Sequence, residues 1–154
     1  MEQAHGIKSY RDLRVWQEAM DLLVEVYRLA ERFPPEERFG LRAQARDAVV
    51  SIPSNIAEGH GRASRKEYRH HISIAEGSLA EVETHVEVGV RLRYCTPEQA
   101  APVLQRCASL GKQLKSLRNA LSRPAPQRAA VTRPSPTPDP QPTTPGPRSL
   151  IPGH

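Results

Sequence analysis

The sequence predicts an all-α protein: an antiparallel, up-down-up-down four-helix bundle followed by a disordered, Pro-rich C-terminal tail. Four segments repeat apolar residues at spacings of three and four, which is typical of amphipathic helices. No segment of the sequence combines strand-like alternation with hairpin turn residues, and the connections are short enough to make successive helices antiparallel. We assign residues 1–9 to a flexible N-terminus, 10–122 to the bundle and 123–154 to the tail.

The first helical segment has a wider apolar face than a lone small bundle requires. Two adjacent stripes run along it, one made of Leu13, Trp16, Met20, Leu23, Tyr27 and Ala30, and the other of Val15, Ala19, Leu22, Val26, Leu29 and Phe33. One stripe is enough to face a core, so the surplus indicates burial on a second side through self-association. We expect Asp12 to be the N-cap of this helix and Pro34-Pro35 to end it.

The second segment opens with a turn at residues 35–38 and is expected to run to Glu58, with Gly59 as its C-cap. Its apolar stripe consists of Leu41, Ala45, Ala48, Ile52 and Ile56. Pro53 lies inside this pattern and removes one backbone hydrogen bond, to the carbonyl of Val49. The nearby polar side chains are suited to satisfy the backbone groups that Pro53 frees; they are Ser51, Ser54 and Asn55.

The third and fourth segments each begin with a capping box. Ser64 and Glu67 form the first box, and Thr96 and Gln99 form the second, with Pro97 at the first helical position. The third segment ends near Tyr94, and its stripe is Tyr68, Ile72, Ala75, Leu79, Val82, Val86 and Gly89. The stripe of the fourth segment is Val103, Cys107, Leu110, Leu114, Leu117 and Leu121.

The net charge of +5 is divided between the bundle and the tail. Residues 1–122 hold 18 Lys and Arg against 16 Asp and Glu, whereas residues 123–154 hold four Arg against one Asp. Ten of the 15 prolines also fall in the tail. A segment of this composition cannot bury enough apolar area to offset its ordering entropy, so we expect it to be disordered.

The composition excludes a membrane partner. No apolar run approaches the ~18 residues of a transmembrane helix, and the first residues lack the apolar core of a signal peptide. Cys95 and Cys107 match no metal-ligand spacing, so we expect reduced thiols in a cytoplasmic protein.

The sequence predicts no catalytic residue, no cofactor and no metal site. A hydrolase site built from Ser51, Glu58 and His60 would lack the strand and turn of a nucleophile elbow. The remaining histidines of the helices lack the i, i+4 spacing of a metal pair, so we expect ordinary, partly exposed side chains at His70, His71 and His85.

One carboxylate, that of Glu76, lies in a largely apolar stretch of the third segment. Arg42 and Arg46 lie one turn apart on the second segment and would meet Glu76 if the two helices pair side by side. We therefore expect an ion pair between these helices that fixes their register.

Basic side chains crowd the start of the third segment, where free backbone N–H groups and the helix dipole also favour anions. Arg42 and Arg46 are expected to extend this patch. Phosphate contacts need only such donors, without a base-reading motif. The predicted nucleic-acid-binding residues are Arg42, Arg46, Arg62, Arg65, Lys66 and Arg69.

Four stretches resemble the four-helix-bundle proteins encoded in 23S rRNA intervening sequences, and the resemblance covers residues 9–121 in order. These stretches are YRDLRVWQ (10–17), FGLRAQ (39–44), AVVSIPSNIAEG (48–59) and IAEGSLAEVE (74–83). The resemblance implies a ring-shaped homopentamer without catalytic residues. It also implies kinship with the accessory proteins of diversity-generating retroelements, which are basic pentamers that bind nucleic acid and a reverse transcriptase.

Two features depart from the family pattern. The family usually has two consecutive basic residues where this chain has Arg46-Asp47, which removes one positive charge from each subunit, and the Pro-rich tail lies outside the pattern. The residues and the resemblance together predict a non-enzymatic homo-oligomer, a pentamer by the resemblance, that binds RNA or DNA through basic patches. The alternative is an assembly module that docks a protein partner, such as a reverse transcriptase, with its charge serving only solubility.

Overall fold

The computed structural model describes residues 6–124, together with Pro140 and Gly146. It contains four α-helices, and their bounds are Arg14–Ala30 (α1), Leu41–His60 (α2), Arg65–Arg91 (α3) and Pro97–Leu121 (α4). Two short 3-10 helices, Tyr10–Asp12 (η1) and Pro35–Glu37 (η2), precede α1 and α2. Residues 6–124 form no strand, which confirms the all-α prediction. The predicted disorder of the tail concerns residues that, beyond Pro124, lie almost entirely outside the described part.

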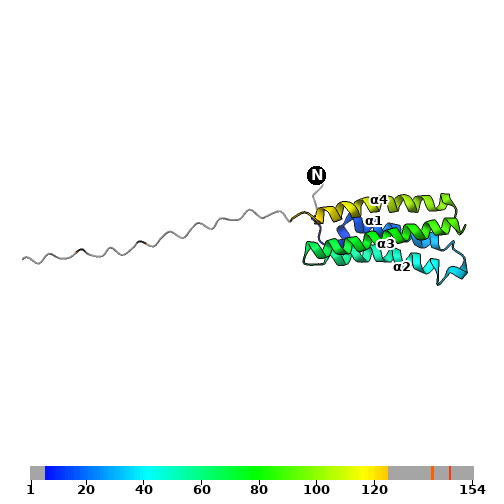
Figure 1. Ribbon diagram of the computed structural model, residues 1–154, viewed down its shortest axis with the longest axis horizontal. Helices are drawn as coiled ribbons and strands as arrows, with labels where there is room; N and C mark the ends of the chain where they lie inside the picture. Colours follow the sequence, from blue (N-terminus) through cyan, green and yellow to red (C-terminus); the bar gives the residue numbers. More distant parts are fainter. Residues whose placement is uncertain (1–5, 125–139, 141–145, 147–154) are drawn as a thin grey trace, which may run out of the picture. The chain divides into compact units, whose positions relative to one another are not determined.

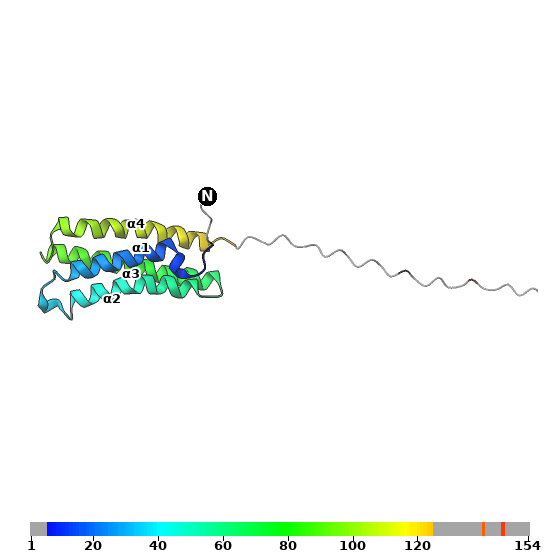
Figure 2. The same cartoon turned by 180° about the vertical axis from the view of Figure 1, so that it is seen from behind.

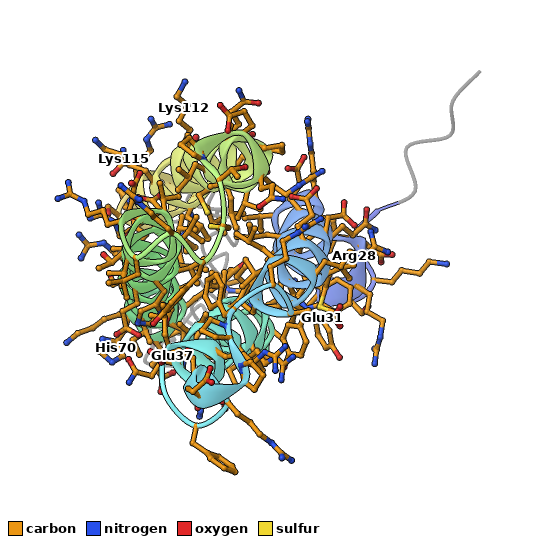
Figure 3. The ribbon with its side chains drawn as sticks, turned by 90° about the vertical axis from the view of Figure 1, so that its right-hand side faces the viewer. Arg28, Glu31, Glu37, His70, Lys112 and Lys115 are labelled. Carbon is orange, nitrogen blue, oxygen red and sulfur yellow. The ribbon has the colours of Figure 1, made fainter. Side chains whose placement is uncertain are left out.

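The four helices lie side by side with their long axes nearly aligned (Figures 1 and 2). Viewed along the bundle in Figure 3, α1 packs between α2 and α4, and α3 completes the arrangement on the opposite side. The Arg42 side chain at the start of α2 donates to the carbonyls of Ala30 and Glu31 at the end of α1. Arg65 at the start of α3 donates to the carbonyl of Ala120 at the end of α4. Each of these two helix pairs is therefore antiparallel.

The core takes one of the two apolar stripes of α1 and leaves most of the other at the surface. Its buried stripe is Val15, Ala19, Leu22, Val26, Leu29 and Phe33. In the other stripe only Ala30 is buried. The remaining members are half-buried; they are Leu13, Trp16, Met20, Leu23 and Tyr27. The apolar surplus predicted for α1 is therefore real and lies beside α2.

The caps of the helices follow the predictions in part. Thr96 and Gln99 form both bonds of a capping box at α4, and the Ser64 hydroxyl accepts the Glu67 backbone N–H at α3. The prediction for Asp12 was wrong, because this residue ends η1 and Leu13 is the N-cap of α1. The Asp12 carboxylate instead accepts the backbone N–H groups of Lys8 and Ser9, and these bonds hold the pKa of Asp12 below its usual value.

The predicted C-cap role of Gly59 was also wrong, because α2 continues through Gly59 to His60 and Gly61 is its C-cap. Gly59 is buried where α2 meets α3. A Cβ atom placed on it would lie 2.8 Å from the Cβ of His71 and 2.8 Å from the Cδ2 of Tyr68. The missing side chain therefore lets the two helices approach closely, which explains a glycine inside a helix despite its conformational cost.

Substitution of Gly59 tests this close approach. We expect Gly59→Ala to destabilise the fold by about 1–3 kcal/mol, since overpacking must push α2 from α3. Gly77 on α3 is the matched control, because a Cβ there meets nothing within 4 Å. Gly77→Ala should stabilise the fold by about 0.5–1 kcal/mol through helix propensity alone. Chemical denaturation measures both changes, and equal effects of the two substitutions would contradict the packing role.

Candidate nucleic-acid interface

The topology collects basic residues at one end of the bundle. Here α1 and α3 begin and α2 and α4 end, so we define the basic end as residues 6–22, 51–78 and 109–124. This end holds eleven Lys and Arg against six Asp and Glu. The far end, residues 23–50 and 79–108, holds eight against nine. The net charge is thus +5 at the basic end and −1 at the far end.

Three of the predicted binding residues are free at this end. Arg62, in the link between α2 and α3, and Lys66 and Arg69, in the first turns of α3, are all exposed. None of their side chains forms an ion pair with a residue in the described part of the chain. Figure 3 shows His70 on α3 and Lys112 and Lys115 on α4 pointing outward in the same way. The cationic groups of Arg62, Lys66 and Arg69, together with those of the two lysines, are therefore available to an external anion.

Arg65 joins this group but has a structural bond as well. Its Nη2 atom donates to the carbonyl of Ala120 at 3.0 Å, a carbonyl at the end of α4 that also accepts the backbone N–H of Arg123. The side chain remains exposed, so its other guanidinium N–H groups can meet a phosphate.

Arg42 and Arg46 do not extend the group of cations at the basic end, contrary to expectation. Arg42 and Arg62 are separated by twenty residues, so a helix rise of 1.5 Å per residue puts them about 30 Å apart along α2. Arg42 donates to the carbonyls of Ala30 and Glu31, both at 2.9 Å. The guanidinium of Arg46 lies 5.1 Å from the centre of the Tyr27 ring. Both side chains thus serve the junction of α1 and α2 at the far end.

The expected ion pair of Glu76 exists but has a different partner. The Glu76 Oε2 atom lies 2.6 Å from the Nε of Arg118, which belongs to α4. Glu76 lies in the half of α3 near the basic end, whereas Arg42 lies at the far end of α2. The pair therefore joins α3 to α4 and withdraws one cation from the basic end.

The polar residues around Pro53 build a network that reaches α3. Ser54 donates to the carbonyl of Val50, and Asn55 donates through Nδ2 to the carbonyl of Ser51 at 2.8 Å. The prediction that these side chains satisfy the group freed by Pro53 was wrong, because neither bond goes to the carbonyl of Val49, which Pro53 leaves without its usual donor. The Oδ1 of Asn55 then lies 3.1 Å from the Nδ1 of His71.

The carboxylate of Glu58 also lies near His71. The Oε2 of Glu58 lies 3.5 Å from the same Nδ1 atom of His71. Tyr68, one turn earlier on α3, packs against Gly59, and burial raises the pKa of its phenol above the usual value. Sequence reasoning missed this arrangement, because Asn55 and His71 are sixteen residues apart and come from different helices.

A shallow cavity of about 520 Å³ lies beside this network, within the basic end. It is lined by Arg62, Lys66, Glu67, His70 and His71. His70 is exposed and His71 is half-buried, as expected for ordinary surface histidines. The cavity nevertheless brings two imidazole rings together with two cations.

A second surface, the apolar groove, lies between α1 and α2. It has a volume of about 300 Å³ and is lined by Tyr10, Trp16, Met20, Leu23, Val50, Pro53, Ser54 and Ala57. Tyr10 meets Trp16 edge-to-face, with ring centres 5.4 Å apart. Most of these residues are half-buried and come from the outward stripe of α1 or the facing side of α2.

A family model described as the 23S rRNA-intervening sequence protein matches residues 11–116. The chain belongs to this family. A crystal structure of a protein of unknown function from the S23 ribosomal protein family of Bacteroides thetaiotaomicron is similar, with a TM-score of 0.63 and 25% identity. The similarity covers 68% of this chain and 97% of that protein. No curated protein matches the chain.

Residues 51–59 of this 23S rRNA-intervening sequence protein have a structural role at the contact between α2 and α3. Asn55 and Glu58 lie within bonding distance of His71, and the missing side chain of Gly59 lets α3 pack closely. The Ser51 hydroxyl lies 2.8 Å from that of Ser78, which ties the same two helices together again. The stretch therefore fixes the junction of α2 and α3 from which Arg62 and Lys66 project.

The two cysteines are buried inside the bundle. Cys95 and Cys107 are free, buried thiols, and burial raises the pKa of Cys107 to about 12. A thiol with so high a pKa is a poor nucleophile. Between residues 6 and 124, no three His, Cys, Asp or Glu side chains are grouped to hold a metal ion. No helix in that range is both long and apolar enough to cross a membrane.

Proposed function

We propose that this protein is a non-enzymatic, cytoplasmic homo-oligomer, a pentamer, that binds RNA or DNA through its basic ends. The excess of eleven basic over six acidic residues at one end of the bundle carries the proposal. Arg62, Lys66 and Arg69 are exposed there without ion-pair partners in the described residues. Oligomerisation repeats this end in every subunit, and the repeated charges bind a polyanion together.

The physics of phosphate binding makes this proposal testable through salt. Binding that neutralises phosphates releases condensed counterions, so affinity falls linearly with salt on logarithmic axes. The slope is about −0.9 for each contacted phosphate in duplex DNA and about −0.7 in single strands. Such contacts carry no sequence information, so we expect little sequence preference.

We expect the full chain to bind a 12-nucleotide single-stranded oligonucleotide with a steep salt dependence in filter binding. Arg62→Ala and Lys66→Ala should each weaken binding and reduce the slope by about 0.7, the loss of one phosphate contact. Arg42→Ala is the matched control, since Arg42 bonds the carbonyls at the end of α1. This variant should melt at a lower temperature and keep the affinity and slope of the wild type.

Two results would contradict the proposal. The first is an absence of binding at low salt, and the second is an affinity that does not change with salt. A loss of binding in Arg42→Ala equal to that in Arg62→Ala would place the site elsewhere on the molecule.

The apolar groove supports self-association. Its lining is mostly half-buried apolar side chains, and Val50 beside them is 39% exposed. Monomeric proteins seldom leave contiguous apolar surface uncovered, and such patches mark interaction sites. A second copy that covers the groove would bury the outward stripe of α1, which accounts for the surplus of apolar residues in that helix.

Sedimentation equilibrium tests the groove. Wild-type protein at micromolar concentration should have a mass five times that of the 17.1 kDa chain. Met20→Glu places a charge in the groove and should yield smaller species. Leu92→Glu alters a 52% exposed residue outside the groove and should leave the mass unchanged. A wild-type monomer, or a Met20→Glu variant of unchanged mass, would rule out this interface.

One observation favours the alternative, an assembly module that docks a protein partner such as a reverse transcriptase. Phe39, at the far end, is 87% exposed, and the Arg38 guanidinium lies 5.3 Å from its ring centre. An exposed aromatic residue of this kind is a typical anchor in protein interfaces. A partner held there would survive charge reversal by Arg62→Glu and Lys66→Glu, whereas nucleic-acid binding would be lost.

A further inference from the structure

We propose that the cavity lined by Arg62, Lys66, Glu67, His70 and His71 holds one unpaired nucleotide of a single strand. In this assignment the phosphate lies on Arg62 and Lys66, and the base lies against the imidazole rings. The inference rests on the proposed function, because it names the part of a nucleic acid that the basic end recognises. It goes beyond that function, because contacts to phosphates alone would bind a nucleotide that carries a base and an abasic nucleotide equally well.

Two neighbouring side chains fix the orientation of the His71 ring and place a hydrogen on its Nδ1 atom. Asn55 uses Nδ2 to donate to Ser51, so its Oδ1 faces His71 as an acceptor. Glu58 Oε2, the other group near the same nitrogen, is also an acceptor. Because both neighbours accept, Nδ1 carries a hydrogen, and Nε2 is the ring's remaining polar atom. A ring fixed in this way loses little freedom when it binds a ligand.

His70 supplies the second ring. It is exposed and follows the first turn of α3, with its ring centre 6.0 Å from that of His71 and the planes inclined at 66°. The exposed His70 ring can therefore meet the face of a base, with the His71 ring beside it. Histidine is among the side chains on which unpaired bases stack, and stacking tolerates any base because every base has a π-face.

The charges around the rings suit a nucleotide. Arg62 and Lys66 are exposed cations in the same lining, and they are the groups that bind a phosphate. The Glu67 carboxylate, which already accepts the Ser64 hydroxyl at 3.1 Å, retains acceptor capacity for the amino group of a base. Glu58 adds a second carboxylate on the α2 side.

Two facts favour an unpaired nucleotide over a base-paired one as the ligand: the size of the cavity, and the position of the bases inside a duplex. A volume of about 520 Å³ falls within the range of small-ligand pockets, roughly 300–1,000 Å³. In a duplex, the bases are stacked and paired inside the helix, so their faces cannot reach the two imidazole rings. An unpaired nucleotide presents its base and its phosphate at once.

Three probes test the inference with the full chain: a 12-nucleotide single-stranded DNA, the same strand with abasic sites in place of its bases, and its blunt duplex. The wild type should bind the intact strand about tenfold more tightly than the abasic strand, since stacking of one base has this magnitude. His70→Ala should remove this difference, and it should leave the affinity for the abasic strand, the affinity for the duplex and the salt slope unchanged. His71→Gln should also reduce the preference.

His85→Ala is the matched control, since His85 lies on α3 in the far end of the bundle and outside this cavity. It should keep the tenfold preference. Equal wild-type affinity for the intact and abasic strands would overturn the nucleotide site while leaving salt-dependent binding, and so the proposed function, in place. Absence of binding to all three probes would overturn both. A His70→Ala variant that keeps the wild-type preference would also overturn the site.

Discussion

The close packing of α2 against α3 at Gly59 is the constraint on which the candidate site depends. A side chain at this position would overlap His71 and Tyr68, so the glycine sets how near the two helices come. At that distance Asn55 reaches His71, and one turn earlier the hydroxyls of Ser51 and Ser78 meet at 2.8 Å. The link between α2 and α3 starts directly after His60, carries Arg62 as its second residue, and enters α3 at Arg65. Its position therefore follows from this contact.

The charge distribution is a second consequence of the fold. Along the chain, basic and acidic residues are interleaved, and the bundle as a whole is only slightly basic. Folding separates them, because the start of α1 and α3 and the end of α2 and α4 meet at one end. Arg42, Arg46 and Arg118 take structural partners, whereas the side chains of Arg62, Lys66 and Arg69 have no ion-pair partner among residues 6–124. The surface available to a polyanion is thus set by topology and by which cations are already occupied.

Much of the fold could be predicted from the sequence, because each helix carries its own apolar stripe and two of the four begin at a recognisable cap. The capping residues Thr96 and Ser64 bond within a few residues, so local sequence decides them. Gly59 could not be predicted correctly, because a glycine that follows an apolar stripe has the pattern of a C-cap until a second helix packs against it. The partner of Glu76 depended on which helix faces it, which no spacing within α3 reveals.

Less of the candidate site than of the fold could be predicted, because part of the site depends on contacts between helices. Arg62, Arg65, Lys66 and Arg69 cluster within eight residues, so their proximity was visible in the sequence. Arg42 and Arg46 lie on the same helix as the residues before Arg62, but the length of α2, about 30 Å, places them at its other end. The anchoring of His71 by Asn55 and Glu58 joins two helices, and no local pattern signals it.

The central claim is that nucleic acid binds at the basic end of the bundle and not along its whole surface. Ultraviolet crosslinking of the full chain to a 12-nucleotide single strand, followed by mass spectrometry of the crosslinked peptides, tests this claim most directly. We predict crosslinks concentrated in residues 58–71, with few in residues 28–47 or 79–108. Crosslinks concentrated in those far-end segments, or spread evenly over the four helices, would contradict it.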